Sequence, residues 1–315
     1  MMTGSIELYG GGSCALPPLL EWDVALTGGV PCDSFSLTCA YDASLTAKLE
    51  RAWRVTLAHG ETVLRAVVDE TEIVQDTAGR TLRINGRGLA ALLLDNEAEA
   101  AEYSAPALSV LLRHHAAPYG IAWEPFSEVR GTTPYAVASA SSRWKALSAF
   151  TRYYGGFALR ITPEGVLQPY PWKDGGTRAV IDAKTPLLRL AWRDRRYGVY
   201  SEVLVVDKVR KASHSVKNEA FLARGGSCRR VLYTPGRSTG AAMRYTGEYQ
   251  ISQSKQGARQ LTAVLAGYFA LRPGKAVRVS RGDIGITGDF YPEEIRFSGG
   301  TDGERTMLRM RRLEE

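Results

Sequence analysis

The strongest constraint on the fold is an alternation of apolar and polar residues, interrupted at short intervals by glycine. Residues 21–26 place Trp22, Val24 and Leu26 on one face, and residues 51–57 repeat the pattern. Successive side chains of a strand point to opposite faces, so a period of two predicts strands with one buried face. The 32 glycines gather in short clusters between apolar runs, which indicates many turns. The chain is therefore expected to be rich in β-structure.

Further strands are expected in both halves of the chain. Most of them pair as hairpins, because a short turn rich in Gly, Asp or Asn separates neighbouring runs. These strands cover residues 62–68, 71–75, 80–85, 157–161, 166–170, 188–192, 199–209, 275–280, 282–287, 294–298 and 304–311.

Three helices are expected among these strands. The first follows Ser104, which is expected to cap it, and its apolar face consists of Leu108, Leu111, Leu112 and His115. The second begins at Ser141–Ser142 and stops at Gly155–Gly156. The third covers residues 261–271, where Leu261, Val264, Leu265 and Tyr268 share a helical face before Pro273.

The first and last β-regions resemble each other. Residues 69–84 and residues 292–309 both contain an acidic entry, an alternating strand, a glycine turn and a return strand that starts Arg-Thr. An internal duplication explains this likeness. So does chance, because polar hairpins draw on a small set of residues, and the sequence leaves both explanations open.

The net charge of +7 permits a polyanion as partner without identifying one. The basic residues are scattered, with small clusters at residues 193–196 and 309–312, and no long Lys/Arg block occurs. Solvated basic faces are expected, and no specific nucleic-acid recognition. The longest apolar stretches, residues 89–94 and 261–271, are too short to span a bilayer, and no signal peptide precedes them.

The most suggestive motif is Gly86-Arg87-Gly88-Leu89-Ala90-Ala91, which has the form GxGxxA. In a dinucleotide site such glycines let the backbone approach a pyrophosphate at a helix N-terminus. Here the apolar stretch ends at Asp95, and no second parallel strand with a terminal acid follows. A strand-to-helix turn without cofactor is the better interpretation.

Other residue types that carry chemistry also lack a site pattern. The carboxylate pairs Glu124/Glu128 and Glu293/Glu294 are interpreted as surface charges, although a glycosidase would need two such groups facing one cleft. The serines near residue 141 are interpreted as a loop and a helix cap. No HExxH or GxSxG motif is present, so the histidines are not expected to bind a metal. The histidines are His59, His114, His115 and His214.

The cysteines and tryptophans are expected to be packing residues. No CxxC pair occurs, and free thiols in a reducing cytoplasm are preferred over a metal site or disulfides. Core packing is preferred over a sugar-binding face for the tryptophans on patterned faces. We therefore expect no catalytic, cofactor-binding or metal-binding residue. The cysteines are Cys14, Cys32, Cys39 and Cys228, and four of the six tryptophans lie on such faces, namely Trp22, Trp53, Trp144 and Trp192.

Read in order, several segments resemble the baseplate hub family of contractile phage tails, which also occurs in phage-derived bacteriocins and prophage remnants. The resemblance is one of order and spacing over nearly the whole chain, and it is more remote to the hub part of type VI secretion spikes. The segments lie within residues 30–42, 67–70, 84–98, 142–156, 273–279 and 285–291.

This resemblance implies an architecture of two tail-tube-type β-barrel domains with an α+β domain between them. The expected boundaries are 1–86, 87–185 and 186–315. It also implies a structural, non-enzymatic hub subunit, in which three copies form a ring that joins a sixfold tail tube to a threefold spike. The implied partners are further copies of the chain, the tube protein, the central spike and other baseplate or tape-measure components.

The implied location is a virion or phage-like particle assembled in the bacterial cytoplasm. A basic channel wall would trap a polyanion, so the excess Arg and Lys are expected on outer or intersubunit surfaces. Two alternatives remain: another structural part, such as a distal tail ring or a carbohydrate-binding adhesin, and a peptidoglycan hydrolase. No segment is left over for an added lysozyme-like or peptidase domain.

Overall fold

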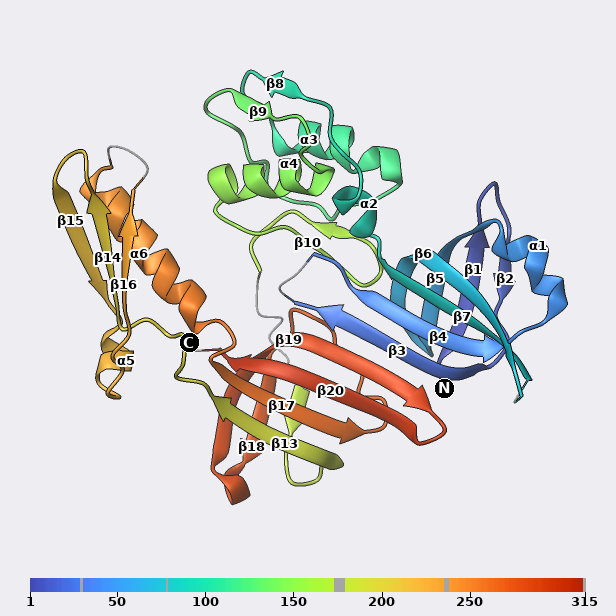
Figure 1. The fold of residues 1–315 in the computed structure, drawn as a ribbon. Helices are drawn as coiled ribbons and strands as arrows, with labels where there is room; N and C mark the ends of the chain where they lie inside the picture. The colour runs from blue at the N-terminus through green and yellow to red at the C-terminus, as the bar shows by residue number, and fades with distance from the viewer. Residues whose placement is uncertain (29–30, 78, 173–178, 235–237, 314–315) are drawn as a thin grey trace. The chain divides into compact units, whose positions relative to one another are not determined.

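The computed structural model describes residues 1–28, 31–77, 79–172, 179–234 and 238–313. The chain divides into two compact units (Figure 1). Unit 1 comprises Met1–Leu188 and Val264–Leu308, and unit 2 comprises Arg189–Ala263 and Arg309–Glu315. The division falls within three strands, β13 (Leu187–Asp194), β17 (Arg259–Ala266) and β20 (Gly303–Arg312).

Unit 1 contains most of the strands. Its other strands are β1 (Thr3–Leu8), β2 (Ser13–Ala15), β3 (Leu19–Thr27), β4 (Ser34–Ala40), β5 (Ala52–His59), β6 (Glu61–Asp76), β7 (Gly79–Gly88), β8 (Ala101–Tyr103), β9 (Tyr135–Val137), β10 (Arg160–Ile161), β11 (Leu167–Gln168), β12 (Ala179–Ile181), β18 (Val277–Arg281) and β19 (Ile286–Gly300). Its α-helices are α1 (Thr46–Leu49), α2 (Ala91–Leu94), α3 (Leu108–His115) and α4 (Arg143–Phe150), and a π-helical turn covers Thr151–Gly155.

One large sheet organises unit 1. Its strand order includes the run β20-β19-β3-β4-β7-β6-β5-β1-β2, so the last hairpin of the chain pairs directly with the first β-region. The junction is antiparallel, with Ile295 opposite Leu26 and Phe297 opposite Val24. All four of these side chains are buried, and burial of large apolar side chains is the main stabilising contribution to such a sheet.

The α+β segment of unit 1 has its own core. Helices α3 and α4 pack together through side chains that the sequence assigned to one face, and Leu108, Leu111, Leu112 and Leu147 are fully buried. Ser142 caps α4 as predicted, because its hydroxyl accepts a hydrogen bond from the Lys145 amide at 3.1 Å. The short β10–β11 hairpin follows, also as predicted.

Unit 2 contains a small three-stranded sheet with a helix against it (Figure 1). Strand β14 (Glu202–Asp207) is central, with β15 (Ala212–Lys217) antiparallel on one side and β16 (Arg229–Tyr233) parallel on the other. Helix α6 (Gly240–Lys255) packs Met243 and Ile251 on Val203 and Val205. A one-turn helix, α5 (Glu219–Leu222), connects β15 to β16.

The predicted helix over residues 261–271 is wrong. Residues 261–266 belong to strand β17, in which Leu261, Ala263 and Leu265 alternate as buried residues, and residues 267–271 form neither helix nor strand. Its apolar residues satisfy a period of two as well as a helical period, and a short apolar run does not separate the two. The long helix of unit 2, α6, has a weak amphipathic pattern and was not predicted.

Two smaller predictions are also wrong. Residues 62–68 and 71–75 belong to one continuous strand, β6, which bends at a bulge between Val68 and Glu70. Ser104 does not cap α3, because the N-cap position is Ala107, which makes no side-chain hydrogen bond to the helix. Residue 78 lies between the predicted strands 71–75 and 80–85, and Val30 begins the first segment that resembles the baseplate hub family. Both lie outside the described residues.

The β-rich α+β class is confirmed. Among the described strands the large sheet is open and not closed into a barrel, so the two tube-type barrels and the boundaries at residues 86 and 185 stay predictions. No helix in the described ranges has the length and apolar character needed to cross a membrane.

Candidate assembly surfaces

Glycines allow the strands at the centre of the large sheet to approach closely. A Cβ atom on Gly86 would lie 2.0 Å from the Val67 carbonyl oxygen and 2.6 Å from the Phe35 ring. At the junction of the first and last β-regions, a Cβ on Gly299 would lie 2.4 Å from the Trp22 ring. These positions accept only glycine, because no room remains for a side chain.

The GxGxxA motif therefore serves sheet packing. Gly86 and Gly88 lie within strand β7, and only the single turn α2 follows. Arg87 pairs with Asp69 at 2.7 Å and with Asp95 at 2.6 Å, so its guanidinium is engaged by carboxylates. These hydrogen bonds raise the pKa of Arg87. The motif has the strand-to-helix geometry expected for it, with the cation already neutralised.

A buried carboxylate, Asp33, lies just before β4 and is hydrogen-bonded to the end of β3. Asp33 is 7% exposed and accepts hydrogen bonds from the Thr27 amide at 2.7 Å and from the Thr27 hydroxyl at 3.1 Å. Its own carbonyl accepts from the Gly88 amide of β7. Burial raises the pKa of Asp33 to about 6, because desolvation disfavours the charged carboxylate.

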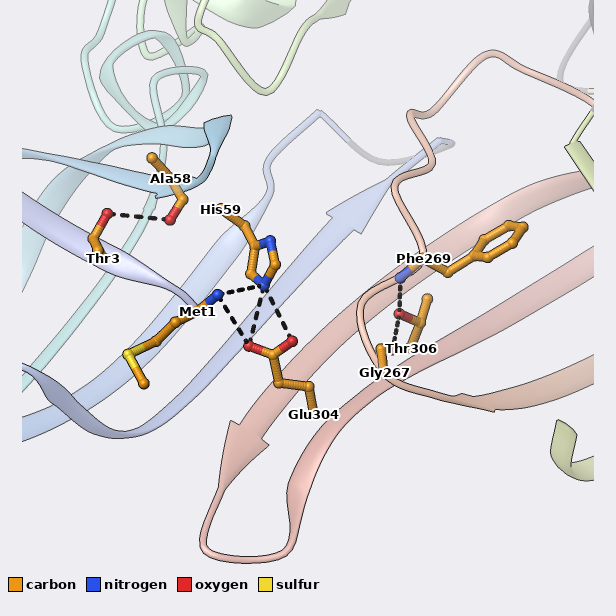
Figure 2. Close-up of polar contacts among 8 residues, drawn as sticks. All are labelled: Met1, Thr3, Ala58, His59, Gly267, Phe269, Glu304 and Thr306. Atoms are coloured by element: carbon orange, nitrogen blue, oxygen red, sulfur yellow. Dashed lines mark hydrogen bonds and ion pairs between the residues drawn. The ribbon is translucent and has the colours of Figure 1, made fainter. Parts of the chain in front are cut away.

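A polar cluster links the β5–β6 turn to the last hairpin (Figure 2). His59 Nε2 lies 3.1 Å from Glu304 of β20, and the His59 ring stacks on Tyr268 with ring centroids 4.1 Å apart. Nearby, the fully buried Thr306 hydroxyl donates to the Gly267 carbonyl and accepts from the Phe269 amide, both at 2.9 Å. The His59–Glu304 contact therefore joins the two hairpins, and the buried Thr306 hydroxyl is satisfied by the segment that follows β17.

The two carboxylates of the pair Glu124/Glu128 contact different parts of the fold. Glu124 accepts hydrogen bonds from Gln168 and Tyr170 of the β11 region. Glu128 instead binds the start of α3, where its two carboxylate oxygens accept from the Ser109 amide at 3.1 Å and the Ser109 hydroxyl at 2.6 Å. Glu128 therefore supplies the cap that the sequence assigned to Ser104, and no shared cleft brings the pair together.

Glu124 contributes to a hollow of about 770 Å³ in unit 1. Trp172 is held there by a hydrogen bond from its indole nitrogen to the Gly274 carbonyl at 2.9 Å, and it packs edge-on with Tyr291. Arg160 and Lys275 also line the hollow. Among the described residues, the lining combines aromatic rings with both signs of charge and contains no nucleophile–base pair.

Two of the four histidines lie near each other. His115 is buried beside Arg143, and burial lowers its pKa to about 4. The Tyr103 hydroxyl lies 3.2 Å from Nδ1 of His114 and 3.4 Å from Nε2 of His115, whereas His214 lies in β15. Over the described ranges no group of three His, Cys, Asp or Glu side chains has the arrangement of a metal site.

All four cysteines are free thiols, with Cys39 buried and the other three half-buried. Burial raises the pKa of Cys32 and Cys39 to about 11, which keeps both thiols protonated at neutral pH. Among the tryptophans, Trp22 is buried as expected and Trp144 packs at the edge of the α3–α4 core. The expectation is wrong for Trp53 and Trp192, which are 39% and 38% exposed.

A bulge explains the exposure of Trp53. In the β1–β5 pairing, Glu7 is opposite Arg54 and Leu8 is opposite Ala52, so Trp53 is the unpaired residue. Trp53 turns outward, and the guanidinium of the buried Arg54 lies 4.0 Å from the centre of its ring. Alternation alone did not indicate this extra residue.

Two sheets end in strands with an unpaired edge. Among the strands that the structure describes, β2 of the large sheet pairs only with β1, and in unit 2, β15 and β16 each pair only with β14. Such edges offer free backbone amides and carbonyls to another chain. Strand β16 also exposes Val231 and Tyr233, whose exposed fractions are 37% and 60%. These edges are candidate assembly surfaces.

The fold is similar to solved tail proteins. A tail protein from Neisseria meningitidis MC58 matches 98% of this chain and 96% of its own, at 17% identity and a TM-score of 0.76. The 43 kDa tail protein of prophage MuSo2 from Shewanella oneidensis matches 99% and 98%, at 13% identity and a TM-score of 0.79. The chain has a phage tail protein fold. The resemblance indicated by the sequence is thus confirmed at the level of the fold.

A third neighbour comes from a secretion system. The Escherichia coli protein c3393, a component of the type VI secretion system, matches 98% of this chain and 77% of its own, at 12% identity and a TM-score of 0.59. Compared by sequence, no family model and no curated protein matches the chain.

Proposed function

We propose that this tail-fold chain is the hub subunit of a contractile tail or a related injection particle. One observation carries the proposal: the likeness to tail proteins extends over 98% of the chain and nearly all of theirs. The likeness to a type VI secretion component, described as similar to tail proteins gp27 and gp5 of bacteriophage T4, supports a hub position. The location proposed is a virion or phage-like particle.

The proposed hub is a homotrimeric ring between a sixfold tail tube and a threefold spike. Each subunit contributes two tube-type β-domains, residues 1–86 and 186–315, and the α+β segment 87–185 lies between them. The open edges of β2, β15 and β16 support this arrangement, because open strands pair with strands of another chain. A structural neighbour in a complex of Francisella PdpA with VgrG supports a spike-side partner.

The proposed role requires no bond chemistry. Glu124 and Glu128 accept hydrogen bonds from side chains or amides of the fold, and His115 and Cys39 are buried. We therefore assign no catalytic, cofactor-binding or metal-binding residue to this function.

Electron microscopy of the purified chain tests the proposal. Class averages of the protein alone should contain a threefold ring with a central channel. Sixfold rings would favour a distal tail ring instead. Particles with neither symmetry would contradict the hub.

A further inference from the structure

The positive charge of the chain is concentrated in unit 2. Residues 189–263 contain 15 Lys and Arg against 5 Asp and Glu, a net charge of +10. The rest of the chain contains 25 Lys and Arg against 28 Asp and Glu, a net charge of −3. The overall charge of +7 therefore conceals two regions of opposite sign. Regions of opposite sign attract each other when separate copies meet.

An exposed part of this basic region is the turn between β14 and β15, residues 208–211, which we call the basic turn. Lys208, Arg210 and Lys211 are all exposed, and Val209 between them is 60% exposed. Beside it, Tyr233 of β16 is 60% exposed and lies 4.1 Å from the Lys208 ammonium. The surface thus combines an apolar centre with a cationic rim.

Asp207 makes the basic turn rigid. Its side chain is buried at the base of the turn and accepts hydrogen bonds from the amides of Val209 at 2.8 Å, Arg210 at 2.9 Å and Ser238 at 2.7 Å. These hydrogen bonds lower the pKa of Asp207. A turn fixed in this way loses little conformational freedom on binding.

Unit 1 contains a segment of complementary charge, residues 97–102, which we call the acidic segment. Glu97, Glu99 and Glu102 are exposed, and the residues between them are alanines. None of the three forms an ion pair within the described ranges, whereas nearby Asp95 is neutralised by Arg87. The acidic segment therefore offers three free carboxylates beside small apolar side chains.

We propose that the basic turn of one copy docks on the acidic segment of a second copy, and that this contact forms part of the ring interface. The inference rests on the proposed trimeric hub and deepens it. Contacts between two different surfaces of identical chains generate rings when the rotation closes. Such a head-to-tail contact uses both charged regions, and it leaves an apolar centre, Val209 and Tyr233, within a charged rim.

A nucleic acid is a less suitable occupant of the basic turn. Base-stacking platforms carry several aromatic rings in a basic groove, whereas this surface has one tyrosine and an aliphatic side chain at its centre. An apolar centre surrounded by charge is typical of protein interfaces. DNA binding is nevertheless an outcome that the experiment detects.

Charge reversal with compensation tests the contact. The solution mass is measured by light scattering after size-exclusion chromatography for four proteins: the wild-type chain, Lys208→Glu/Lys211→Glu, Glu97→Lys/Glu99→Lys, and the variant with all four changes. Arg193→Glu/Lys255→Glu is the matched control, because it makes the same charge change in unit 2 at exposed positions away from the turn. Circular dichroism and thermal melting verify that each variant folds.

The inference predicts that either double reversal weakens trimer formation by about tenfold or more, because close charge pairs at an interface couple strongly. The fourfold variant restores the trimer, and the control keeps it. High salt, about 500 mM, weakens the wild-type trimer in the same direction, since it screens exposed charges.

Two results overturn the inference and are distinguishable. A wild-type chain that remains a monomer at every concentration contradicts the proposed hub, and the inference falls with it. A wild-type trimer that both double reversals leave intact contradicts only the proposed contact. Fluorescence polarisation with a labelled DNA duplex adds a third measurement: if reversal of the basic turn abolishes DNA binding and leaves the trimer unchanged, the turn serves DNA instead.

Discussion

The buried position of Asp33 disfavours the ionised form of its carboxyl group. Its two hydrogen bonds from Thr27 favour the ionised form, yet burial outweighs them and raises the pKa to about 6. The unfolded chain ionises this group near pH 4, about two pH units lower. Protonated Asp33 therefore stabilises the fold below about pH 4, and this contribution is lost as the pH rises through about 6.

Replacement of Asp33 by Asn is expected to stabilise the protein at pH 7 by up to about 3 kcal/mol, because the neutral amide retains an acceptor for Thr27 and carries no charge to desolvate. Near pH 4 the variant and the wild type should be equally stable. Urea unfolding of both proteins between about pH 4 and pH 8 measures the difference. Asp302→Asn, at an exposed turn, is the control. A pH-independent difference between Asp33→Asn and the wild type would contradict this account.

The second prediction concerns Gly86, where the neighbouring strand lies too close for a side chain. A methyl group there meets the Val67 carbonyl at 2.0 Å, so Gly86→Ala should cost about 2 kcal/mol or more. Gly282→Ala is the matched control, since its Cβ would meet nothing within 4 Å. Thermal unfolding of both variants compares them. A Gly86→Ala protein as stable as the control would show that the strands have room to separate.

Single residues were predictable from the sequence where the alternation is unbroken. Trp22, Val24 and Leu26 are buried as predicted, because β3 keeps its period of two through them. Trp53 is exposed because a bulge shifts the register of β5 by one residue at that point. The sequence contains no glycine or proline that indicates this bulge, so its effect on Trp53 was not predictable.

At the scale of elements, helix α3 is closed by a residue distant in sequence. Glu128 accepts hydrogen bonds from the Ser109 amide and hydroxyl, in the first turn where amide groups lack partners within the helix. A carboxylate at that end also interacts favourably with the helix dipole. The cap cannot be read from local sequence, because its donor and acceptor are 19 positions apart.

Glu128→Ala is therefore expected to cost about 1 kcal/mol of stability, the usual loss for a helix cap. Ser104→Ala should change stability by less than about 0.5 kcal/mol, because Ser104 is exposed and does not cap the helix. Denaturant unfolding of the two single variants makes the comparison. A larger loss of stability for Ser104→Ala than for Glu128→Ala would contradict this account and favour Ser104 as the cap.

Whether a segment forms a helix or a strand was predictable where its length and its flanking turn residues agree with the spacing of its apolar residues. The final hairpin and the capped helix α4 have all three signals and were predicted correctly. Strand β17 was mistaken for a helix because Leu261 and Leu265 fit both periods, and its neighbours in the sheet decide the outcome. Helix α6 buries only Met243, Gly247 and Ile251, so its apolar stripe was too narrow to recognise.

At the scale of the whole molecule, the order of regions was predictable, whereas the pairing between them was not. The likeness of residues 69–84 and 292–309 indicated two related hairpins, and the structure places both in one large sheet. Whether they derive from duplication stays a prediction. The direct pairing of β19 with β3 depends on contacts across most of the chain, which no local pattern carries.

The distribution of charge also became clear only with the division into units. In sequence, the basic residues look scattered, with small clusters at residues 193–196 and 309–312. Grouped by unit, they give residues 189–263 a net charge of +10. The expectation that the excess lies on outer or intersubunit surfaces stays a prediction, and it is one that the proposed ring contact makes specific.

The central claim is that three copies of this chain form a closed hub. The most direct test is the solution mass of the wild-type protein at low salt, measured by light scattering across a range of concentrations. The account predicts a species at three times the chain mass of 34.4 kDa, whose fraction increases with concentration. A single species at 34.4 kDa throughout that range, or a sixfold mass, would contradict it.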